Sequence, residues 1–203
     1  MNDQREFWNE RFGREGYFYG TTANCYLASH IDTLPPQQTI LFLGEGEGRN
    51  AVYALEREHI VTALDAAEIG LAKTAMLAQS KGRQLSLIHT DLEQWNPTQQ
   101  YDAIMCSFLH LTEPLRSEVF TKAIEHLNKG GLFVGEFFSI HQFPKTTGGP
   151  KDLDLLYTAD LLSTILTALP CEILELYEIE TELQEGKVHN GLASVVRVKV
   201  KKR

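Results

Sequence analysis

The sequence is poor in cysteine and lacks any long hydrophobic run. Its 203 residues include only three cysteines, Cys25, Cys106 and Cys171, without the CxxC or Cys/His spacing of a zinc site. We therefore expect neither a disulfide framework nor a bound metal, and a reducing cytoplasm fits this cysteine usage. No stretch approaches the roughly 20 apolar residues of a membrane span, and the polar first residues do not resemble a signal peptide. A soluble, cytoplasmic protein that makes no membrane contact is the prediction.

Positive charge is also scarce, because 19 Lys and Arg stand against 27 Asp and Glu, which gives a formal net charge of −8. Phosphate backbones bind through clustered Lys and Arg, so this balance disfavours nucleic acid as a partner. We interpret the basic run over 197–203 as a solvated strand end and tail. With 43% hydrophobic and 23% charged residues, the composition is that of an ordinary globular domain. We predict a single domain over residues 1–203, as a monomer or a weak homodimer.

Short apolar runs alternate with helical patterns along the first two thirds of the chain. The predicted strands span 39–43, 60–64, 85–89, 101–106 and 132–138, and the predicted helices span 50–58, 68–80 and 113–128. After a loop over 139–155, the remaining elements are a helix at 158–169 and strands at 171–182 and 192–201, joined by a hairpin turn at 185–191. This order predicts an α/β fold, with a parallel sheet, helices on both faces and an antiparallel last strand.

Two of these elements carry more detailed expectations. The apolar set expected to face inward from the helix at 68–80 is Ile69, Leu71, Ala72, Ala75, Met76 and Ala78. LysGlyGly at 129–131 is interpreted as the stop signal between the third helix and the fifth strand.

A glycine-rich segment, Gly44-x-Gly46-x-Gly48, stands where the first predicted strand turns into the first helix. Glycines there let the backbone approach a ligand, and ligands of open α/β sheets bind at the carboxyl ends of the strands. A dinucleotide fingerprint requires a small residue where this chain has Arg49, and no Walker-type GKS or GKT follows. A nicotinamide-dependent oxidoreductase is therefore the weaker interpretation.

Acidic residues follow the next two strands. Asp65 ends the second strand, where a carboxylate can accept hydrogen bonds from both hydroxyls of a ribose, and its alternative role is that of a helix cap. Asp91 stands beyond the third strand, where it can accept from an exocyclic adenine amine while Leu92 supplies a backbone N–H. These strand ends and the glycine loop together describe an adenosine pocket.

Several segments, in the same order, resemble class I S-adenosylmethionine-dependent methyltransferases: LeuGlyGluGlyGluGlyArgAsn (43–50), AlaLeuAsp (63–65), ThrAspLeu (90–92), 101–111 and 127–133. Segments 7–12, 17–20, 46–51 and ThrGlyGlyPro (147–150) resemble the bacterial small-molecule branch related to tellurite-resistance and thiopurine methyltransferases. The resemblance implies a Rossmann-like, seven-stranded sheet in the order 3-2-1-4-5-7-6 with the last strand antiparallel. It divides the domain into an N-terminal lid (1–38), a cofactor-binding core (39–138) and a part with the acceptor loop and closing hairpin (139–203).

The same resemblance implies methyl transfer from S-adenosylmethionine to a small-molecule acceptor, a soft sulfur, selenium or tellurium nucleophile being one option. A non-catalytic module that binds S-adenosylmethionine or S-adenosylhomocysteine stays open as the alternative. The implied cofactor residues are Gly44, Glu45, Gly46, Gly48, Asn50, Asp65, Ala66, Asp91, Leu92, Cys106 and Ser107. Glu45 is expected near the methionyl ammonium group. As a free thiol, Cys106 is interpreted as a small buried hydrophobe rather than a nucleophile.

Methyl transfer depends more on placement than on a base, since orientation is worth roughly 7–11 kcal/mol and a general base roughly 3–5 kcal/mol. Candidates for proton transfer or acceptor binding are His110, Glu136 and His141, each weighed against a plain structural hydrogen bond. Tyr19 is the preferred lid residue among the aromatics of the N-terminal segment. His189 and Lys145 are weaker candidates for reaching the acceptor.

Overall fold

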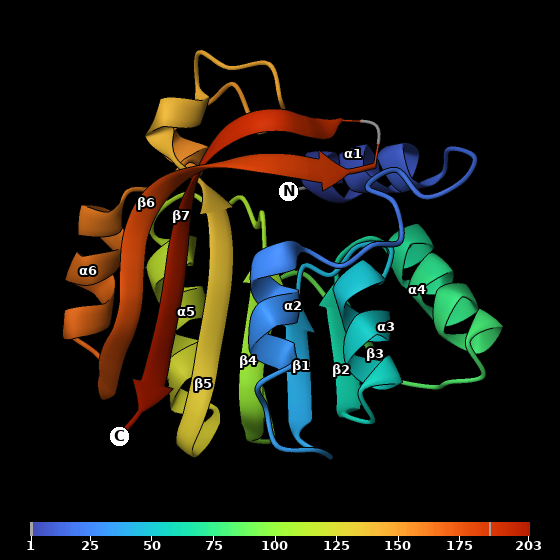
Figure 1. Cartoon of the computed structure of the whole chain (residues 1–203), viewed down its shortest axis with the longest axis horizontal. Coiled ribbons are helices and arrows are strands. Elements are labelled where there is room, and N and C mark those ends of the chain that lie inside the picture. The colour runs from blue at the N-terminus through green and yellow to red at the C-terminus, as the bar shows by residue number, and fades with distance from the viewer. Residues whose placement is uncertain (1, 187) are drawn as a thin grey trace.

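The computed structural model describes residues 2–186 and 188–203, so that Met1 of the predicted lid and Lys187 of the predicted turn lie outside the described residues. One sheet has the strand order β3-β2-β1-β4-β5-β7-β6 (Figure 1). Its strands are β1 Thr39–Leu43, β2 Ile60–Asp65, β3 Ser86–His89, β4 Tyr101–Ser107, β5 Leu127–Phe138, β6 Cys171–Glu185 and β7 His189–Lys202. Only β7 pairs antiparallel with its neighbours, β5 and β6. The predicted order and the single reversed strand are confirmed.

Helices cover both faces of this sheet, with α2, α3 and α4 on one side and α5 and α6 on the other (Figure 1). The helices are α1 Asn2–Phe12, α2 Cys25–Ile31, α3 Arg49–Glu56, α4 Glu68–Ser80, α5 Leu115–Glu125 and α6 Ala159–Thr167, with short 3₁₀ helices η1 Ile140–Gln142 and η2 Leu153–Leu155. Among the residues described, no helix is long and apolar enough to cross a membrane.

The continuous apolar run of β1 follows from this double cover. Ile40 and Phe42 pack with α2, α3 and α4, whereas Leu41 and Leu43 point to the layer of α5 and α6. Successive side chains of a strand face opposite sides, so a strand covered on both faces has no position left for a polar residue. The carboxyl ends of the parallel strands are thereby held at one edge by two hydrophobic layers.

Helix α4 has the predicted bounds, but its inward set was partly wrong. Ile69 is 37% exposed and Met76 is 64% exposed, whereas Thr74 is fully buried. Thr74 lies against the glycine loop, where its hydroxyl donates a hydrogen bond to the Gly46 carbonyl oxygen at 2.9 Å. In a helix this rich in alanine, apolar periodicity does not distinguish the face that packs against the loop.

Two further elements differ from prediction. β5 begins at Leu127, so LysGlyGly lies inside an irregular start of the strand instead of separating it from the helix. α2 was not predicted at all, although Asn24 caps it by accepting a hydrogen bond from the Leu27 N–H.

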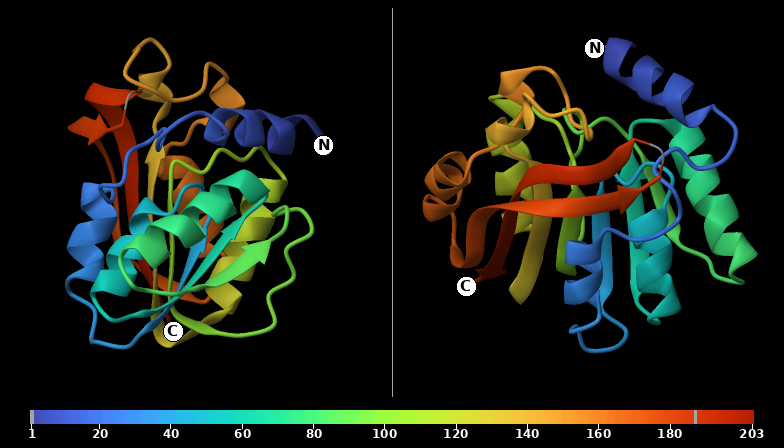
Figure 2. Two further views of the ribbon diagram at one scale, coloured as in Figure 1. Left: turned by 90° about the vertical axis from the view of Figure 1, so that its right-hand side faces the viewer. Right: turned by 45° about the horizontal axis from the view of Figure 1, so that its top comes forward.

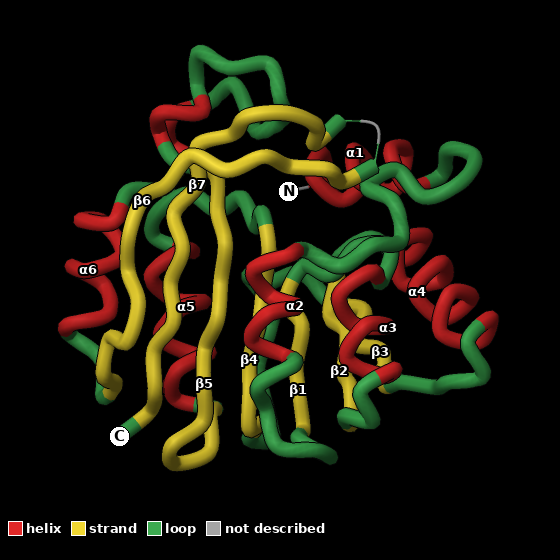
Figure 3. The backbone as a smooth tube through the Cα atoms, viewed as in Figure 1, coloured by secondary structure: helices red, strands yellow, loops and turns green. Residues whose placement is uncertain are grey.

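The hairpin of β6 and β7 is longer than predicted and continues beyond the sheet. β7 pairs with β5 only as far as Val195, while β6 and β7 stay paired up to Glu185 and His189. The end of the hairpin, where β7 no longer pairs with β5, bends over the carboxyl edge of the sheet towards α1 (Figures 2 and 3). Gly186 at its turn packs directly on the lid, because a Cβ there would lie 2.5 Å from the Tyr19 carbonyl carbon. Lid and hairpin together form a roof over the strand ends.

Candidate active site

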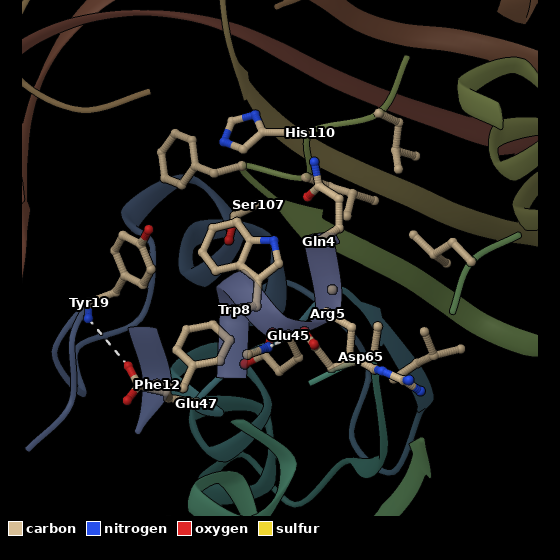
Figure 4. A pocket seen from close by; sticks show the side chains of 18 of the residues that line it. Gln4, Arg5, Trp8, Phe12, Tyr19, Glu45, Glu47, Asp65, Ser107 and His110 are labelled. Carbon is tan, nitrogen blue, oxygen red and sulfur yellow. Dashed lines mark hydrogen bonds between the residues drawn. The ribbon is translucent and has the colours of Figure 1, made fainter. Parts of the chain in front are cut away.

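A cavity of about 320 Å³ lies under this roof, at the carboxyl ends of β1, β2 and β4 (Figure 4). It brings together most of the residues predicted for the site. The predicted residues that line it are Tyr19, Gly44, Glu45, Gly46, Asn50, Asp65, Ala66, Asp91, Leu92, Ser107 and His110. The cavity wall therefore combines the glycine loop, three strand ends and the lid.

The glycines of the loop are required by close contacts. Gly44 and Gly46 have φ angles of 61° and 64°, in the left-handed region that favours glycine. A Cβ at Gly46 would lie 2.9 Å from the Phe12 ring of α1, so the lid packs directly on the loop. Gly48 does not line the cavity; its Cβ would lie within 2.8 Å of Thr74. Gly48 thus fits the loop against α4, and its predicted approach to the cofactor stays a prediction.

Glu45 caps helix α3 from inside the loop. Its Oε1 accepts hydrogen bonds from the N–H groups of Asn50 and Ala51, both at 2.8 Å, and its Oε2 accepts from Asn50 Nδ2 at 3.3 Å. Burial raises the pKa of Glu45 to about 7, against the opposing effect of these hydrogen bonds. Oε2 accepts only the longer hydrogen bond, and Glu45 lies in the cavity wall. Oε2 is therefore the oxygen that can still accept a hydrogen bond from a cationic ligand.

Asp65 connects the end of β2 to the glycine loop. Its Oδ2 accepts the Gly46 N–H at 2.8 Å and its Oδ1 accepts the Ala67 N–H at 2.7 Å. Each carboxylate oxygen has a second lone pair, so both can still accept from a ligand hydroxyl. Asp91 lines the cavity from the end of β3 and holds its own turn through the Glu93 N–H at 3.1 Å.

The wall formed by β4 ends in a strained residue. Phe108 has a φ of 53°, which is uncommon for a residue other than glycine, and its ring stacks on Phe138 at 4.4 Å between centroids. The turn brings the Ser107 hydroxyl to 3.2 Å from Asn50 Nδ2. Strained backbone of this kind occurs preferentially at functional sites, where surrounding contacts impose it.

Besides Gly48, three predicted residues lie outside the cavity wall. Glu136 is 1% exposed, pairs with Arg197 Nε at 2.6 Å and accepts from Asn24 Nδ2 at 2.6 Å, so its carboxylate is occupied by internal partners. Cys106 is buried in the hydrophobic layer of α5 and α6. The His141 side chain is 71% exposed and its Nε2 lies 3.7 Å from Glu178. The structure does not bring these three side chains to the cavity wall, and their predicted roles at the reacting centre or the cofactor stay predictions.

His110 and Tyr19 do line the cavity, together with Trp8 of α1 (Figure 4). Burial lowers the pKa of His110 to about 4, and its Nδ1 is enclosed without a hydrogen-bond partner among the residues described. Tyr19 accepts a hydrogen bond from Arg11 Nη1 at 3.0 Å, and burial raises the pKa of Tyr19. Both side chains are therefore neutral near pH 7 and can serve as hydrogen-bonding groups for a second substrate.

The charged residues that hold the lid and the hairpin in place were not predicted from the sequence. Glu47 accepts the Phe18 N–H at 2.6 Å and pairs with Lys73 Nζ at 2.8 Å, which ties the lid to α4. Arg49 pairs through Nη2 with Glu185 of the hairpin at 2.9 Å, while its Nη1 is enclosed and has no partner in the described part of the chain. Since both partners of each pair lie far apart in the sequence, no local spacing could have revealed them.

Comparison with known proteins finds one family similarity. Residues 40–131 match the family model of a methyltransferase domain. This match covers less than half of the chain, from β1 to the start of β5. It agrees with the predicted resemblance to class I S-adenosylmethionine-dependent methyltransferases. A comparison with curated protein sequences finds no match.

Solved structures share the fold of nearly the whole chain at low sequence identity. TehB from Haemophilus influenzae aligns with a TM-score of 0.73 and 17% identity, over 98% of this chain and 67% of TehB. A protein that converts a disulfide bond into a thioacetal group during echinomycin biosynthesis aligns with a TM-score of 0.77 and 16% identity, over 98% and 92%. The N-methyltransferase NodS from Bradyrhizobium japonicum, in complex with S-adenosylhomocysteine, aligns with a TM-score of 0.73 and 12% identity, over 98% and 97%.

Proposed function

We propose that the chain is an S-adenosylmethionine-dependent methyltransferase that acts on a small-molecule acceptor, with a soft nucleophile, sulfur above all, as the favoured class. The observation that supports this proposal is that the lid and the hairpin cover the cavity. Trp8 and Tyr19 of the lid and His189 of the hairpin line it together with the strand-end residues. A covered cavity suits a compact acceptor better than a polymer. The related protein of echinomycin biosynthesis, which acts on a disulfide, supports sulfur as the accepting atom.

The residues present fit S-adenosylmethionine. The site has a cradle of glycines in which a Cβ would clash and acidic groups at two strand ends. Together with Arg49 Nη1, which has no hydrogen-bond partner among the described residues, it offers the donors and acceptors that the ribose, adenine and methionyl groups need. We propose that Asp65 and Ala66 hold the ribose side, Asp91 and Leu92 the adenine, and Gly44, Glu45, Gly46, Asn50 and Ser107 the methionyl part. When bound, the cofactor supplies an activated methyl group on a sulfonium.

The protein's contribution is then orientation and shielding. Neutral His110 and Tyr19 position the acceptor, and the aromatic wall of Trp8 and Phe108 excludes water from the reacting centre. A domain of this arrangement that only bound the cofactor would not need a second set of residues around the adjoining space. Of that second set, Trp8 and Tyr19 belong to the lid, whereas Phe108 and His110 directly follow β4.

Methyl transfer can be tested with methyl-deuterated S-adenosylmethionine and a panel of thiols, a selenol, tellurite, amines and phenols, with mass spectrometry of the products. We expect labelled methyl on a sulfur acceptor. Binding of S-adenosylhomocysteine, measured by calorimetry, is the companion experiment. Tight binding with no labelled product from any acceptor would contradict the proposal and support the non-catalytic alternative.

A further inference from the structure

His189 lies where lid, hairpin and sheet meet. It begins β7, is 5% exposed and lines the cavity. Its ring centroid lies 4.6 Å from that of Tyr19, 4.8 Å from Phe108 and 5.1 Å from Phe138. These neighbours come from the lid and from the ends of β4 and β5. The ring is therefore fixed at the covered end of the cavity by contacts from three parts of the fold.

Glu185 determines how this ring is oriented. Its Oε2 lies 3.3 Å from His189 Nδ1 and accepts from Arg49 Nη2 at 2.9 Å, while its Oε1 accepts from Asn24 Nδ2 at 2.9 Å. Burial would raise the pKa of Glu185, but the hydrogen bond with His189 and the charge of Arg49 outweigh it and lower the pKa to about 2. An ionised carboxylate beside Nδ1 keeps the proton of the neutral ring on Nδ1 and leaves a lone pair on Nε2.

The surroundings distinguish His189 from His110, the other histidine of the cavity. Burial lowers the pKa of both rings, but only His189 has a carboxylate that opposes this effect. Arg11 and Arg49 are the positive groups that act against protonation of His189, and Glu185 acts in its favour. Since protonation of one ring disfavours that of the other, Glu185 directs a proton to His189.

A glycine of the loop after β5 packs closely against the other edge of the ring. A Cβ at Gly148 would lie 2.6 Å from His189 Cδ2 and 3.2 Å from its Nε2. Any other residue at position 148 would press on the edge that carries the lone pair. This gives the ThrGlyGlyPro segment a physical reason within the site.

We propose that His189 and Glu185 form a dyad that takes the proton of the methyl acceptor, an inference that rests on the proposed function. The acceptor accordingly arrives as a protonated nucleophile, a thiol, hydroxyl or N–H group, rather than as a preformed anion. As its nucleophilic atom bonds to the methyl carbon, the bond from that carbon to the sulfonium breaks, and its electron pair stays on sulfur. The proton moves from the acceptor to Nε2, and the imidazolium is stabilised by Glu185 until it releases the proton to water.

Nitrogen-15 NMR of the imidazole rings tests the dyad without turnover. In the full chain saturated with S-adenosylhomocysteine at pH 7.5, we expect His189 to carry its proton on Nδ1 and a bare Nε2. The Glu185→Gln variant should lose this preference, because a neutral amide no longer selects the Nδ1 tautomer. A wild-type ring protonated on Nε2 would overturn the proposal. This measurement does not depend on the folding of a His189 variant.

Kinetics supply the second test, with two thiols that differ in protonation at pH 7.5. Phenylmethanethiol keeps its proton, whereas 4-nitrothiophenol is already a thiolate. His189→Gln should lower kcat/KM about 100-fold or more for the first thiol and less than about tenfold for the second. The matched control is His126→Gln, since His126 follows α5 at the opposite end of the sheet and its ring contacts the Lys122 carbonyl oxygen through Nδ1 at 2.8 Å.

The outcomes separate this inference from the proposed function. Equal losses for both thiols would overturn the dyad and leave His189 a packing role. If the wild type methylates no acceptor although it binds S-adenosylhomocysteine, the proposed function fails, and the tautomer of His189 still decides whether the dyad exists.

Discussion

Glu45→Gln should make the protein more stable at alkaline pH while weakening its binding of S-adenosylhomocysteine. Burial raises the pKa of Glu45 from 4.5 to about 7, so the ionised carboxylate is disfavoured in the folded state. One pKa unit corresponds to about 1.4 kcal/mol, and the rise therefore corresponds to about 3 kcal/mol. The two N–H groups at the start of α3 that Glu45 caps both donate to its Oε1. Glutamine keeps an acceptor oxygen at this position.

The pH dependence of stability that Glu45 causes has the opposite sign to that of an ordinary paired carboxylate. Because the folded pKa lies above the unfolded one, the folded state binds the proton more tightly, and stability falls as pH rises from about 4.5 to about 7. Glutamine has no charge to bury and lacks this loss. The gain in free energy of unfolding of Glu45→Gln over wild type should thus be larger at pH 8 than at pH 5 by about 2–3 kcal/mol.

Urea unfolding followed by circular dichroism at pH 5 and pH 8 measures this difference without cofactor. Comparing the two pH values cancels effects of the amide that do not depend on pH. Glu125→Gln, an exposed position on α5, is the matched control and should show no pH-dependent gain. A Glu45→Gln difference that is equal at both pH values, or larger at pH 5, would refute the reasoning and show that the helix N-terminus outweighs burial.

Calorimetry should show S-adenosylhomocysteine binding weakened by about 1.5–3 kcal/mol if Glu45 contacts the ammonium group.

Three further substitutions or treatments test other parts of the site. Asp65→Ala should weaken S-adenosylhomocysteine binding by about 1–3 kcal/mol in calorimetry, and unchanged affinity would remove Asp65 from the cofactor site. Gly48→Ala should lower the free energy of unfolding by about 2 kcal/mol or more, because the added Cβ would meet Thr74 within 2.8 Å at a φ of 93°, and a loss below about 0.5 kcal/mol would contradict that contact. Ellman's reagent should label exposed Cys25 in the native protein while Cys106, whose pKa burial raises, reacts only after unfolding; prompt labelling of Cys106 would show that its layer opens.

The sheet could be predicted because its strands are local patterns bounded by clear stop signals. β1 and α4 have the expected bounds, since a buried apolar run and a helix ended by Gly82 depend on neighbours in sequence. α2 was missed because its seven residues make fewer than two helical turns, which is too short for an apolar periodicity to repeat. The ends of β6 and β7 were missed because their pairing beyond the sheet is stabilised by contacts with the lid, which no local pattern records.

The same division applies to the site. Gly44, Asp65 and Asp91 could be predicted because the carboxyl ends of parallel strands meet at one edge, so a position just after a strand already implies a place in space. Glu136 was predicted by the same reasoning, and the structure shows that its side chain pairs with Arg197. A carboxylate at a strand end demands a partner, and only the tertiary structure decides whether that partner is a ligand or another side chain.

Asn24 shows how the predicted and the unpredicted halves of the site are joined. Its backbone N–H donates to Asn50 Oδ1 at 2.9 Å, in the wall of the cofactor side. Its Nδ2 donates both to Glu136 at 2.6 Å and to Glu185 at 2.9 Å, so one buried amide bridges the sheet and the hairpin. Each of these carboxylates is also paired with an arginine, and removing one partner of a buried charged network leaves the others uncompensated. The hairpin therefore cannot move away from the cavity without disturbing the residues that flank the glycine loop, which couples closure of the acceptor side to the order of the cofactor side.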